Sequence, residues 1–336
     1  STGGGVVGGA AHCSCEEKWT DPDTIARRVR EEAPHTVFPA DMAPIADFVG
    51  WGPGCLALYL GSKPQFSDET VWFFPREDDA EEWPPLRFDP ENAWWRLHEA
   101  TLRRLVAESN GAYLIGCPDL VENLDVLASL RGSERVLFDL VERPEWVVEK
   151  IAEINKVWLE AYTRIWQIIR AEDGSSAYQA FGLWGQGKTA KLQCDISAMI
   201  SDEMFDRFVV PGLVEQTGWL DNSVYHLDGT QALHHLESLC AIDSLDAIEW
   251  TPQAGVEGGG DPRWYGIYRK ILDAGKSVMT VHVSASDVIP LLDAVGPDGI
   301  FLHIQGLEAP GELEAIAEAV GKRFPVVDEG SWTTTR

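Results

Sequence analysis

The sequence has few basic residues for its size, and this shortage excludes polyanionic partners. It contains 27 Lys and Arg against 54 Asp and Glu in 336 residues, a formal net charge of −27 at pH 7. No cluster of Lys and Arg offsets this charge. A surface of that sign repels the phosphate backbone of nucleic acids and anionic lipid. We therefore expect neither a nucleic-acid partner nor a membrane partner.

Long apolar runs and a regular cysteine pattern are also missing. No run approaches the roughly 20 apolar residues that a membrane helix needs, and no secretory signal stretch is present. The six cysteines follow no disulfide spacing. These features predict a soluble protein of the reducing cytoplasm. Hydrophobic residues make up 45% of the chain and it has 14 Trp, which is enough for one large buried core.

Strand-like apolar runs alternate with helix-like segments along most of the chain. The predicted strands are 36–49, 111–117, 177–184, 223–226, 247–250, 277–283, 299–304 and 324–327. The predicted helices between them are 119–131, 134–141, 144–171, 202–216, 230–241, 262–274, 286–294 and 310–320. This alternation predicts an α/β fold, specifically a (β/α)8 TIM barrel with helical and hairpin additions at the N-terminal side. An open doubly wound sheet is disfavoured because no Gly-x-Gly-x-x-Gly follows a strand.

The chain is expected to form one domain after a short leader. Residues 1–20, Gly- and Ala-rich over their first half, are predicted to be flexible. Residues 21–336 are predicted to be a single barrel domain. His12, Cys13 and Cys15 are three metal-binding side chains close together, but no second Cys/His cluster lies nearby in sequence to complete a zinc site.

Three predicted strands end in a histidine, at His226, His282 and His303. Active sites of (β/α)8 enzymes lie at the C-terminal ends of the strands. His226 and Asp228 are two residues apart, so their side chains point to the same face of the strand. Together with His303 they match the three ligands of a catalytic zinc site. The alternative is a histidine held by its own hydrogen bonds, with the aspartate capping the next helix.

Other polar and aromatic side chains at the strand ends complete the predicted site. Those expected to be catalytic are His282, as a general acid or base or a fourth ligand, with Glu249 and Asp195. Those expected to contact the substrate are Trp184, Trp250, Asp119, Tyr225 and Gln305. Each also has a structural interpretation. A strand-end carboxylate can form a salt bridge, an Asp before a helix can cap it, and a Trp can pack in the core.

Three blocks of sequence resemble the uroporphyrinogen decarboxylase superfamily, whose other large branch is the corrinoid-dependent methyltransferases. They are Asp-Ile-Ser-Ala-Met-Ile-Ser-Asp-Glu-Met-Phe-Asp-Arg-Phe-Val-Val-Pro at 195–211, Tyr-His-Leu-Asp-Gly at 225–229, and the segment 119–140. The resemblance covers most of residues 35–330 and implies a (β/α)8 barrel.

Departures from the family pattern favour its methyltransferase branch. The Arg-Gln-Ala-Gly-Arg-Tyr block of the decarboxylases is absent, and residues 48–50, where their catalytic Asp is expected, contain no carboxylate. The methyltransferases hold zinc with His-x-Cys and a distant Cys. Here His226 matches, Asp228 replaces the first Cys and His303 could replace the second. Imidazole and carboxylate ligands would make the metal a harder Lewis acid than thiolates do.

The resemblance thus implies an enzyme that transfers a methyl group between a small substrate and a corrinoid or thiol acceptor with the help of zinc. No corrinoid-binding Asp-x-His-x-x-Gly motif occurs, so a separate protein would carry the corrinoid. A homodimer stays open. Two other functions also stay open. One is a decarboxylase or lyase of a small carboxylic acid with Asp119 or Asp195 as proton donor, and the other is a non-catalytic ligand-binding barrel.

Overall fold

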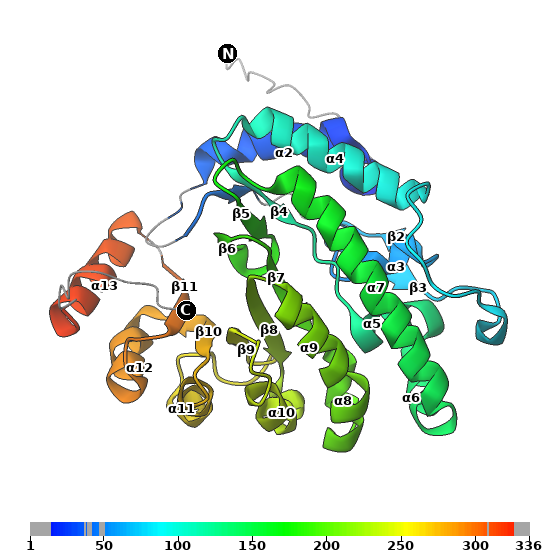
Figure 1. The fold of residues 1–336 in the computed structure, drawn as a ribbon. Coiled ribbons are helices and arrows are strands. Elements are labelled where there is room, and N and C mark those ends of the chain that lie inside the picture. The colour runs from blue at the N-terminus through cyan, green and yellow to red at the C-terminus, as the bar shows by residue number, and fades with distance from the viewer. Residues whose placement is uncertain (1–14, 37, 39–41, 47–50, 308, 326–336) are drawn as a thin grey trace, which may run out of the picture.

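The computed structural model describes residues 15–36, 38, 42–46, 51–307 and 309–325. Two mainly parallel sheets and a hairpin form its strand framework (Figure 1). One sheet has the order β1-β4-β5-β6 and the other β11-β10-β9-β8-β7, while β2 pairs with β3. The strands are β1 Ile45–Ala46, β2 Lys63–Phe66, β3 Val71–Phe74, β4 Leu114–Cys117, β5 Ser175–Tyr178, β6 Leu183–Gln186, β7 Thr189–Gln193, β8 Asn222–Asp228, β9 Ala247–Thr251, β10 Ser277–Ser284 and β11 Ile300–Gln305.

Helices α7 to α12 lie beside one another around the outside of the strands, and α2 and α4 cross one end (Figure 1). The helices are α1 Cys15–Thr20, α2 Pro22–Glu32, α3 Leu56–Tyr59, α4 Ala93–Ser109, α5 Asn123–Arg131, α6 Ser133–Glu142, α7 Pro144–Ile169, α8 Asp202–Phe208, α9 Val210–Trp219, α10 Leu236–Cys240, α11 Tyr265–Asp273, α12 Val288–Val295 and α13 Pro310–Arg323. Within the described ranges, no helix has the length and hydrophobicity to cross a membrane.

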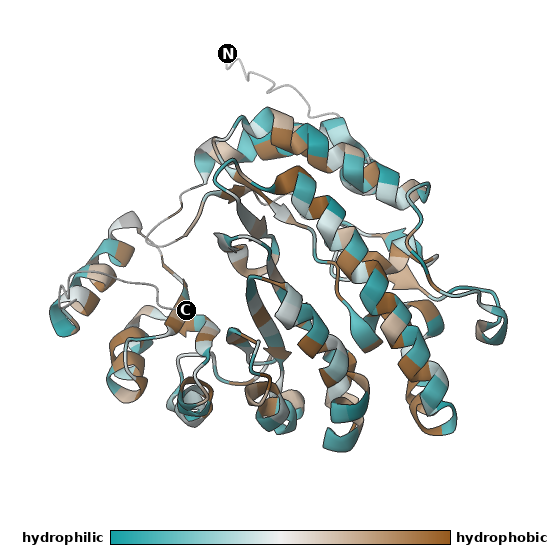
Figure 2. Ribbon diagram, viewed as in Figure 1, coloured by the Kyte–Doolittle hydropathy of each residue, from teal (hydrophilic) through white to brown (hydrophobic). Residues whose placement is uncertain are grey.

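The longest helix, α7, shows why these segments are helical and where they pack. Pro144 stands in its first turn, where a missing N–H costs nothing. Its buried residues recur at helical spacing, among them Val147, Ile151, Ile154 and Trp158. Figure 2 shows helices with hydrophobic residues on one side and hydrophilic residues on the other. Burial of the hydrophobic sides against the strands therefore holds the helix layer in place.

The two sheets meet at a junction that the sequence did not reveal. The predicted strand 177–184 is wrong, because β5 and β6 are two strands that turn back on each other and pair antiparallel. β6 occupies the edge of β5, and the next parallel strand is β7, which the sequence analysis missed. The Ser176 hydroxyl on β5 donates to the carbonyl of Gly187 at 2.6 Å and accepts from the Thr189 amide at 3.3 Å. A side chain thus links the sheets here.

The expected α/β class with parallel strands is confirmed. In the described part of the chain the parallel strands are divided between two sheets, and no pairing joins β11 to β1. The strand predicted at 324–327 is not formed at Phe324 and Pro325, which follow α13, and residues 326–327 lie outside the described residues. The strand predicted at 36–49 is reduced to β1, with several of its residues also outside that part.

The start of the chain is only partly covered by the structure. Residues 1–14 of the predicted leader, including His12 and Cys13, lie outside the described residues. Residues 15–20 form helix α1, in which Trp19 is buried. The Trp19 ring nitrogen donates to the carbonyl of Ser67 at 2.7 Å. This contact fixes α1 against the turn between β2 and β3.

Trp158 tests the packing of α7. It is fully buried, with its ring stacked on Tyr162 at 5.2 Å between centroids and edge-on to Trp219 at 6.2 Å. We expect Trp158→Ala to lower the free energy of unfolding by about 3–5 kcal/mol, because it opens a cavity between α7 and α9. Urea denaturation followed by circular dichroism measures this. Trp72→Ala on exposed β3 is the control and should change stability by less than about 0.5 kcal/mol. Equal losses in the two variants would contradict the packing.

Candidate active site

The three strand-end histidines line one cavity. His226 at the end of β8, His282 on β10 and His303 on β11 all contribute to a cavity of about 780 Å³. Phe181, from the turn between β5 and β6, also contributes to its wall, and much of the rest is aliphatic. A mostly apolar cavity with a few polar groups is typical of a small-molecule site.

His226 is oriented by a fully buried carboxylate. It stands opposite Glu249 in the β8–β9 register, and its Nδ1 contacts Glu249 Oε2. The other oxygen of Glu249 accepts a hydrogen bond from the Thr251 hydroxyl at 2.7 Å. Since Nδ1 is engaged, Nε2 is the nitrogen left to bind a ligand. A carboxylate behind a histidine is the usual support of a metal-ligating imidazole.

Two carboxylates lie beside this histidine. Ligand atoms of Asp195, His226 and Asp228 lie within 4.8 Å of one another. His303, which the sequence placed with His226 and Asp228, belongs to no such group among the described residues. Burial lowers the pKa of His303, against the raising effects of Glu249 and of a hydrogen bond to the Phe181 backbone. A neutral imidazole is therefore favoured at this position.

Phe181 connects the two sheets at the cavity. Its ring lies 5.0 Å from that of His226 between centroids, while its backbone contacts His303. It adopts φ = +61°, a conformation that bulky side chains rarely take. The turn Ala180–Gly182 thus holds a strained residue between two histidines of the cavity.

His282 stands on an irregularity of β10. The register with β11 shifts between Thr280 and Val283, and His282 has φ = +59°. Its Nδ1 is 2.8 Å from Gln305 Oε1 and therefore carries the hydrogen of this bond. A Cβ at Gly258 would overlap the carbonyl oxygen of His282. The glycine brings the loop after β9 close enough to support the irregular backbone.

A buried lysine begins a polar chain that ends at Asp195. Lys191 on β7 is 2% exposed and donates to Asp119 Oδ2 at 2.8 Å and to Gln193 Oε1. The side-chain amide of Gln193 then donates to Asp195 Oδ2 at 2.8 Å. Tyr178 donates to the other oxygen of Asp119 at 3.2 Å. The hydrogen bonds that come from β7 orient Asp195 toward His226.

A second carboxylate supports the backbone of Asp195. Asp125 accepts hydrogen bonds from the amides of Asp195 at 2.7 Å and Ile196 at 3.0 Å. Burial, followed by the charge of Asp195, raises the pKa of Asp125 to about 7. Burial also raises the pKa of Asp195; His226 and Lys191 oppose this, and Asp228 adds to it. The two carboxyls form a coupled pair that retains a proton near neutral pH.

Of the remaining predicted site residues, Gln305 lines the cavity and the others do not. Trp184 is half-exposed on β6. Trp250 and Tyr225 are buried in the core, and Trp250 packs 5.0 Å from Trp264 between ring centroids. Asp119 belongs to the lysine network, while Gln305 lines the cavity beside His282.

Several polar residues of this region were not expected from the sequence, namely Lys191, Gln193, Glu122, Asp125 and Thr251. The signal for the first two was the alternation in Thr-Ala-Lys-Leu-Gln at 189–193, which is typical of a strand. Glu122 is fully buried and accepts a hydrogen bond from the backbone N–H of Gln193 at 2.5 Å. Burial raises its pKa well above the ordinary range.

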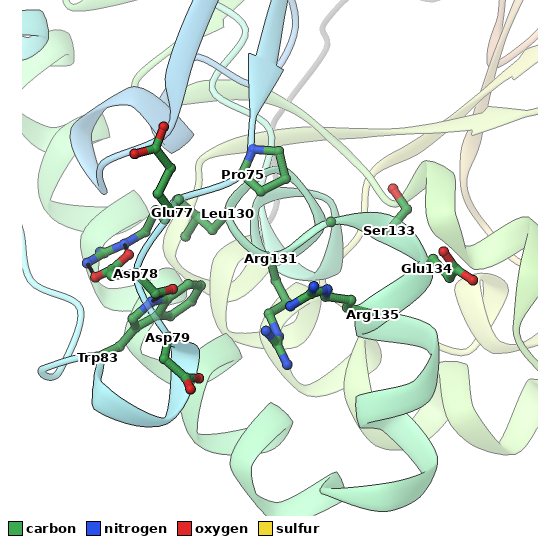
Figure 3. Close-up of a pocket in the computed structure, with 12 residues that line it drawn as sticks. Pro75, Glu77, Asp78, Asp79, Trp83, Leu130, Arg131, Ser133, Glu134 and Arg135 are labelled. Carbon is green, nitrogen blue, oxygen red and sulfur yellow. Dashed lines mark hydrogen bonds and ion pairs between the residues drawn. The ribbon is translucent and has the colours of Figure 1, made fainter.

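A second cavity, of about 610 Å³, lies between the end of β3 and the start of α6 (Figure 3). Arg76, Arg131 and Arg135 line it with several acidic side chains. Arg76 pairs with Asp78 at 2.5 Å and Arg131 with Asp139 at 3.0 Å. The two cavities share no lining residue. We assign the candidate active site to the cavity that the three strand-end histidines line.

Comparison with known proteins supports the fold. No protein-family model and no curated protein sequence matches the chain. Among solved structures, a methyltransferase from Methanosarcina mazei is similar, with a TM-score of 0.61 and 8% sequence identity, over 91% of this chain and 86% of that one. At this identity the likeness concerns the fold alone.

The Asp125–Asp195 pair makes stability depend on pH. Because burial raises the pKa of Asp125 from 3.8 to about 7, the protonated carboxyl stabilises the fold, and this contribution is lost as pH rises from about 4 through about 7. The slope approaches about 1.4 kcal/mol per pH unit. We expect Asp195→Asn to flatten this decline, because it removes the neighbouring charge. Urea denaturation between pH 5 and 8 with a chelator present measures it.

Asp243→Asn, an exposed carboxylate, is the control for this experiment. It should keep the wild-type pH profile. An Asp195→Asn profile that also coincides with wild type would show that the pair is not coupled in the folded protein.

Proposed function

We propose that the chain is a methyltransferase-like enzyme, in which a divalent metal assists methyl transfer between a small substrate and a corrinoid or thiol acceptor. The observation that carries this proposal is the arrangement of His226, backed by buried Glu249, beside Asp195 and Asp228. The three blocks of sequence resemblance support the reaction class, and the structural likeness to a methyltransferase supports the fold.

We further propose that the two sheets are parts of one (β/α)8 barrel of the uroporphyrinogen decarboxylase type. Eight of the strands run parallel in the order β1-β4-β5 and β7-β8-β9-β10-β11. The antiparallel β6 inserts between the two groups. The cavity then lies at the C-terminal ends of the strands, where such barrels carry their active sites.

The donor set fits a divalent cation. It offers one imidazole nitrogen and two carboxylates, the ligand types that zinc accepts in sites with an open coordination position. The sequence predicted His303 as the third ligand. We propose Asp195 instead, because its carboxylate lies near His226 and Asp228. A bound cation would act as a Lewis acid toward a water, thiol or hydroxyl group.

The protein's own residues supply orientation and proton transfer. Glu249 and Thr251 fix the His226 ring, and the Lys191 chain fixes Asp195. The bond to Gln305 holds His282 with Nε2 free to exchange a proton with a substrate in the cavity. His303, kept neutral by burial, can accept one.

The corrinoid is proposed to arrive on a separate protein, because the chain has no Asp-x-His-x-x-Gly motif. With a net charge of −27, the surface favours a partner whose docking face carries positive charge.

Metal binding tests the site. We expect His226→Ala to lose one equivalent of zinc relative to wild type. Glu249→Gln should bind at this site about 10–100-fold more weakly, because the amide no longer orients the imidazole. Competition titration with a chromophoric chelator, together with elemental analysis, measures both effects. Glu257→Gln, the same change at an exposed position, should leave affinity unchanged. Equal zinc content in wild type and His226→Ala would contradict the assignment.

A second function is favoured by the protonated carboxyl pair. Burial raises the pKa of Asp195, so it can hold a proton for a carbanion formed by decarboxylation. Buried Lys191 provides a positive charge nearby. The chain would then act as a metal-independent decarboxylase or lyase of a small carboxylic acid, with Asp195 as donor.

Chelation separates the two functions. With free methylcobalamin and a panel of small thiols, methyl transfer by the metal-dependent enzyme should fall at least about 100-fold after dialysis against a chelator, and return with zinc. With a panel of small carboxylic acids, release of carbon dioxide by the alternative enzyme should not change on chelation and should be lost in Asp195→Asn. Ligand binding without turnover in either assay would indicate a binding barrel.

A further inference from the structure

A second cluster of metal-binding side chains lies outside the cavity. Ligand atoms of Asp202, His234 and His235 lie within 4.8 Å of one another. Asp202 is the first residue of α8, and the two histidines end the 3-10 helix η5 (Thr230–His235), which follows β8. We propose that these three residues bind a divalent cation of the zinc class, at a site separate from the cavity.

The hydrogen bonds of His235 define which of its nitrogens is free. Its Nε2 lies 2.9 Å from the carbonyl oxygen of Ser197. A carbonyl oxygen only accepts hydrogen bonds, so Nε2 carries the hydrogen and Nδ1 of the neutral ring carries a lone pair. This Nδ1 is buried without a hydrogen-bond partner. The side chain as a whole is 1% exposed.

Another acceptor lies beside this nitrogen. Asp202 Oδ1 lies 3.1 Å from His235 Nδ1. An ionised carboxylate and an imidazole lone pair repel each other at this distance unless a positive charge stands between or beside them. Either a proton on the ring or a metal ion supplies that charge. An imidazole and a carboxylate are both ordinary zinc ligands.

The spacing of the three ligands fits a metal ion. Zinc bonds of about 2.0–2.2 Å in a tetrahedron place neighbouring ligand atoms roughly 3.3 Å apart. Asp202 Oδ1 lies 3.1 Å from His235 Nδ1 and 3.7 Å from His234 Nε2, on either side of that value. His234 Nε2 also donates to the carbonyl of Ile200 at 3.1 Å. On metal binding, His234 Nε2 would lose this hydrogen bond and its proton and would coordinate the metal instead.

The site combines a rigid buried ligand with exposed ones. His235 is stacked on Phe205 with 4.2 Å between ring centroids and an interplanar angle of 13°. Side chains of Asp202 and His234 are 56% and 40% exposed, so a cation can enter from solvent and keep a water in its fourth position. The net charge of −27 attracts cations to the surface.

A cation here would connect the two segments that leave the candidate active site. One runs from Asp195 to the start of α8, and the other from Asp228 through η5. The inferred role is therefore structural: the metal would hold these two segments together. The proposal does not depend on the proposed function, because none of its ligands belongs to the cavity.

Zinc titration in the His226→Ala background tests the second site alone. We expect this variant to retain one equivalent of zinc. Adding Asp202→Asn or His234→Gln should weaken that binding at least about 100-fold, since loss of a ligand exceeds the effect of losing an outer-shell partner. Both side chains are exposed, so both variants should fold. Asp206→Asn, an exposed carboxylate of the same helix, is the matched control and should bind zinc like its parent.

Two further measurements identify the ligands. Zinc should raise the melting temperature of His226→Ala but not of His226→Ala/Asp202→Asn. X-ray absorption at the zinc edge should count two imidazoles in the first variant. The proposal is overturned if His226→Ala binds no zinc at micromolar concentration, or if its zinc is unaffected by Asp202→Asn. Either result would show that a proton between Asp202 and His235 satisfies the pair.

Discussion

The fully buried carboxylate of Glu249 is the constraint on which the candidate site depends. A buried carboxyl group needs hydrogen-bond partners, and Glu249 contacts His226 with one oxygen and Thr251 with the other. The first contact crosses from β8 to β9 and requires the observed register, in which His226 stands opposite Glu249. Strand pairing, imidazole orientation and the position of Asp228, two residues further on, are thus set by one interaction.

The two faces of the strands have different roles, because one packs in the core and the other carries the polar groups of the candidate site. On β8, Tyr225 and Leu227 are buried, while His226 between them is partly accessible and faces the cavity. On β7, Lys191 and Gln193 carry the polar chain that ends at Asp195. Packing of α7 and its neighbours against the strands supplies the hydrophobic energy. The opposite face can therefore hold charged groups that by themselves would oppose folding.

How far the sequence predicts this arrangement depends on which residues carry the signal. Strands β9 to β11 and helix α7 were predicted within a few residues, because apolar residues mark them. Strand β7 was missed because Lys191 and Gln193 gave it a polar appearance, and the β5–β6 turn was hidden inside one apolar run. The meeting of His226 with Asp228 follows from strand periodicity. That Asp195 joins them does not, because its position depends on the Lys191 and Asp125 contacts.

The excess of acidic residues acts differently at long and short range. At long range it repels polyanions, as the composition indicates. At short range, carboxylates placed near one another must gain a proton or a cation, because burial and mutual repulsion disfavour a second unbalanced charge. Asp125 and Asp195 are such a pair, and burial, followed by the charge of Asp195, raises the pKa of Asp125 to about 7. In the two proposed metal sites, the histidines beside Asp195 and Asp202 would let a metal ion balance the carboxylate charge and also bind an imidazole lone pair.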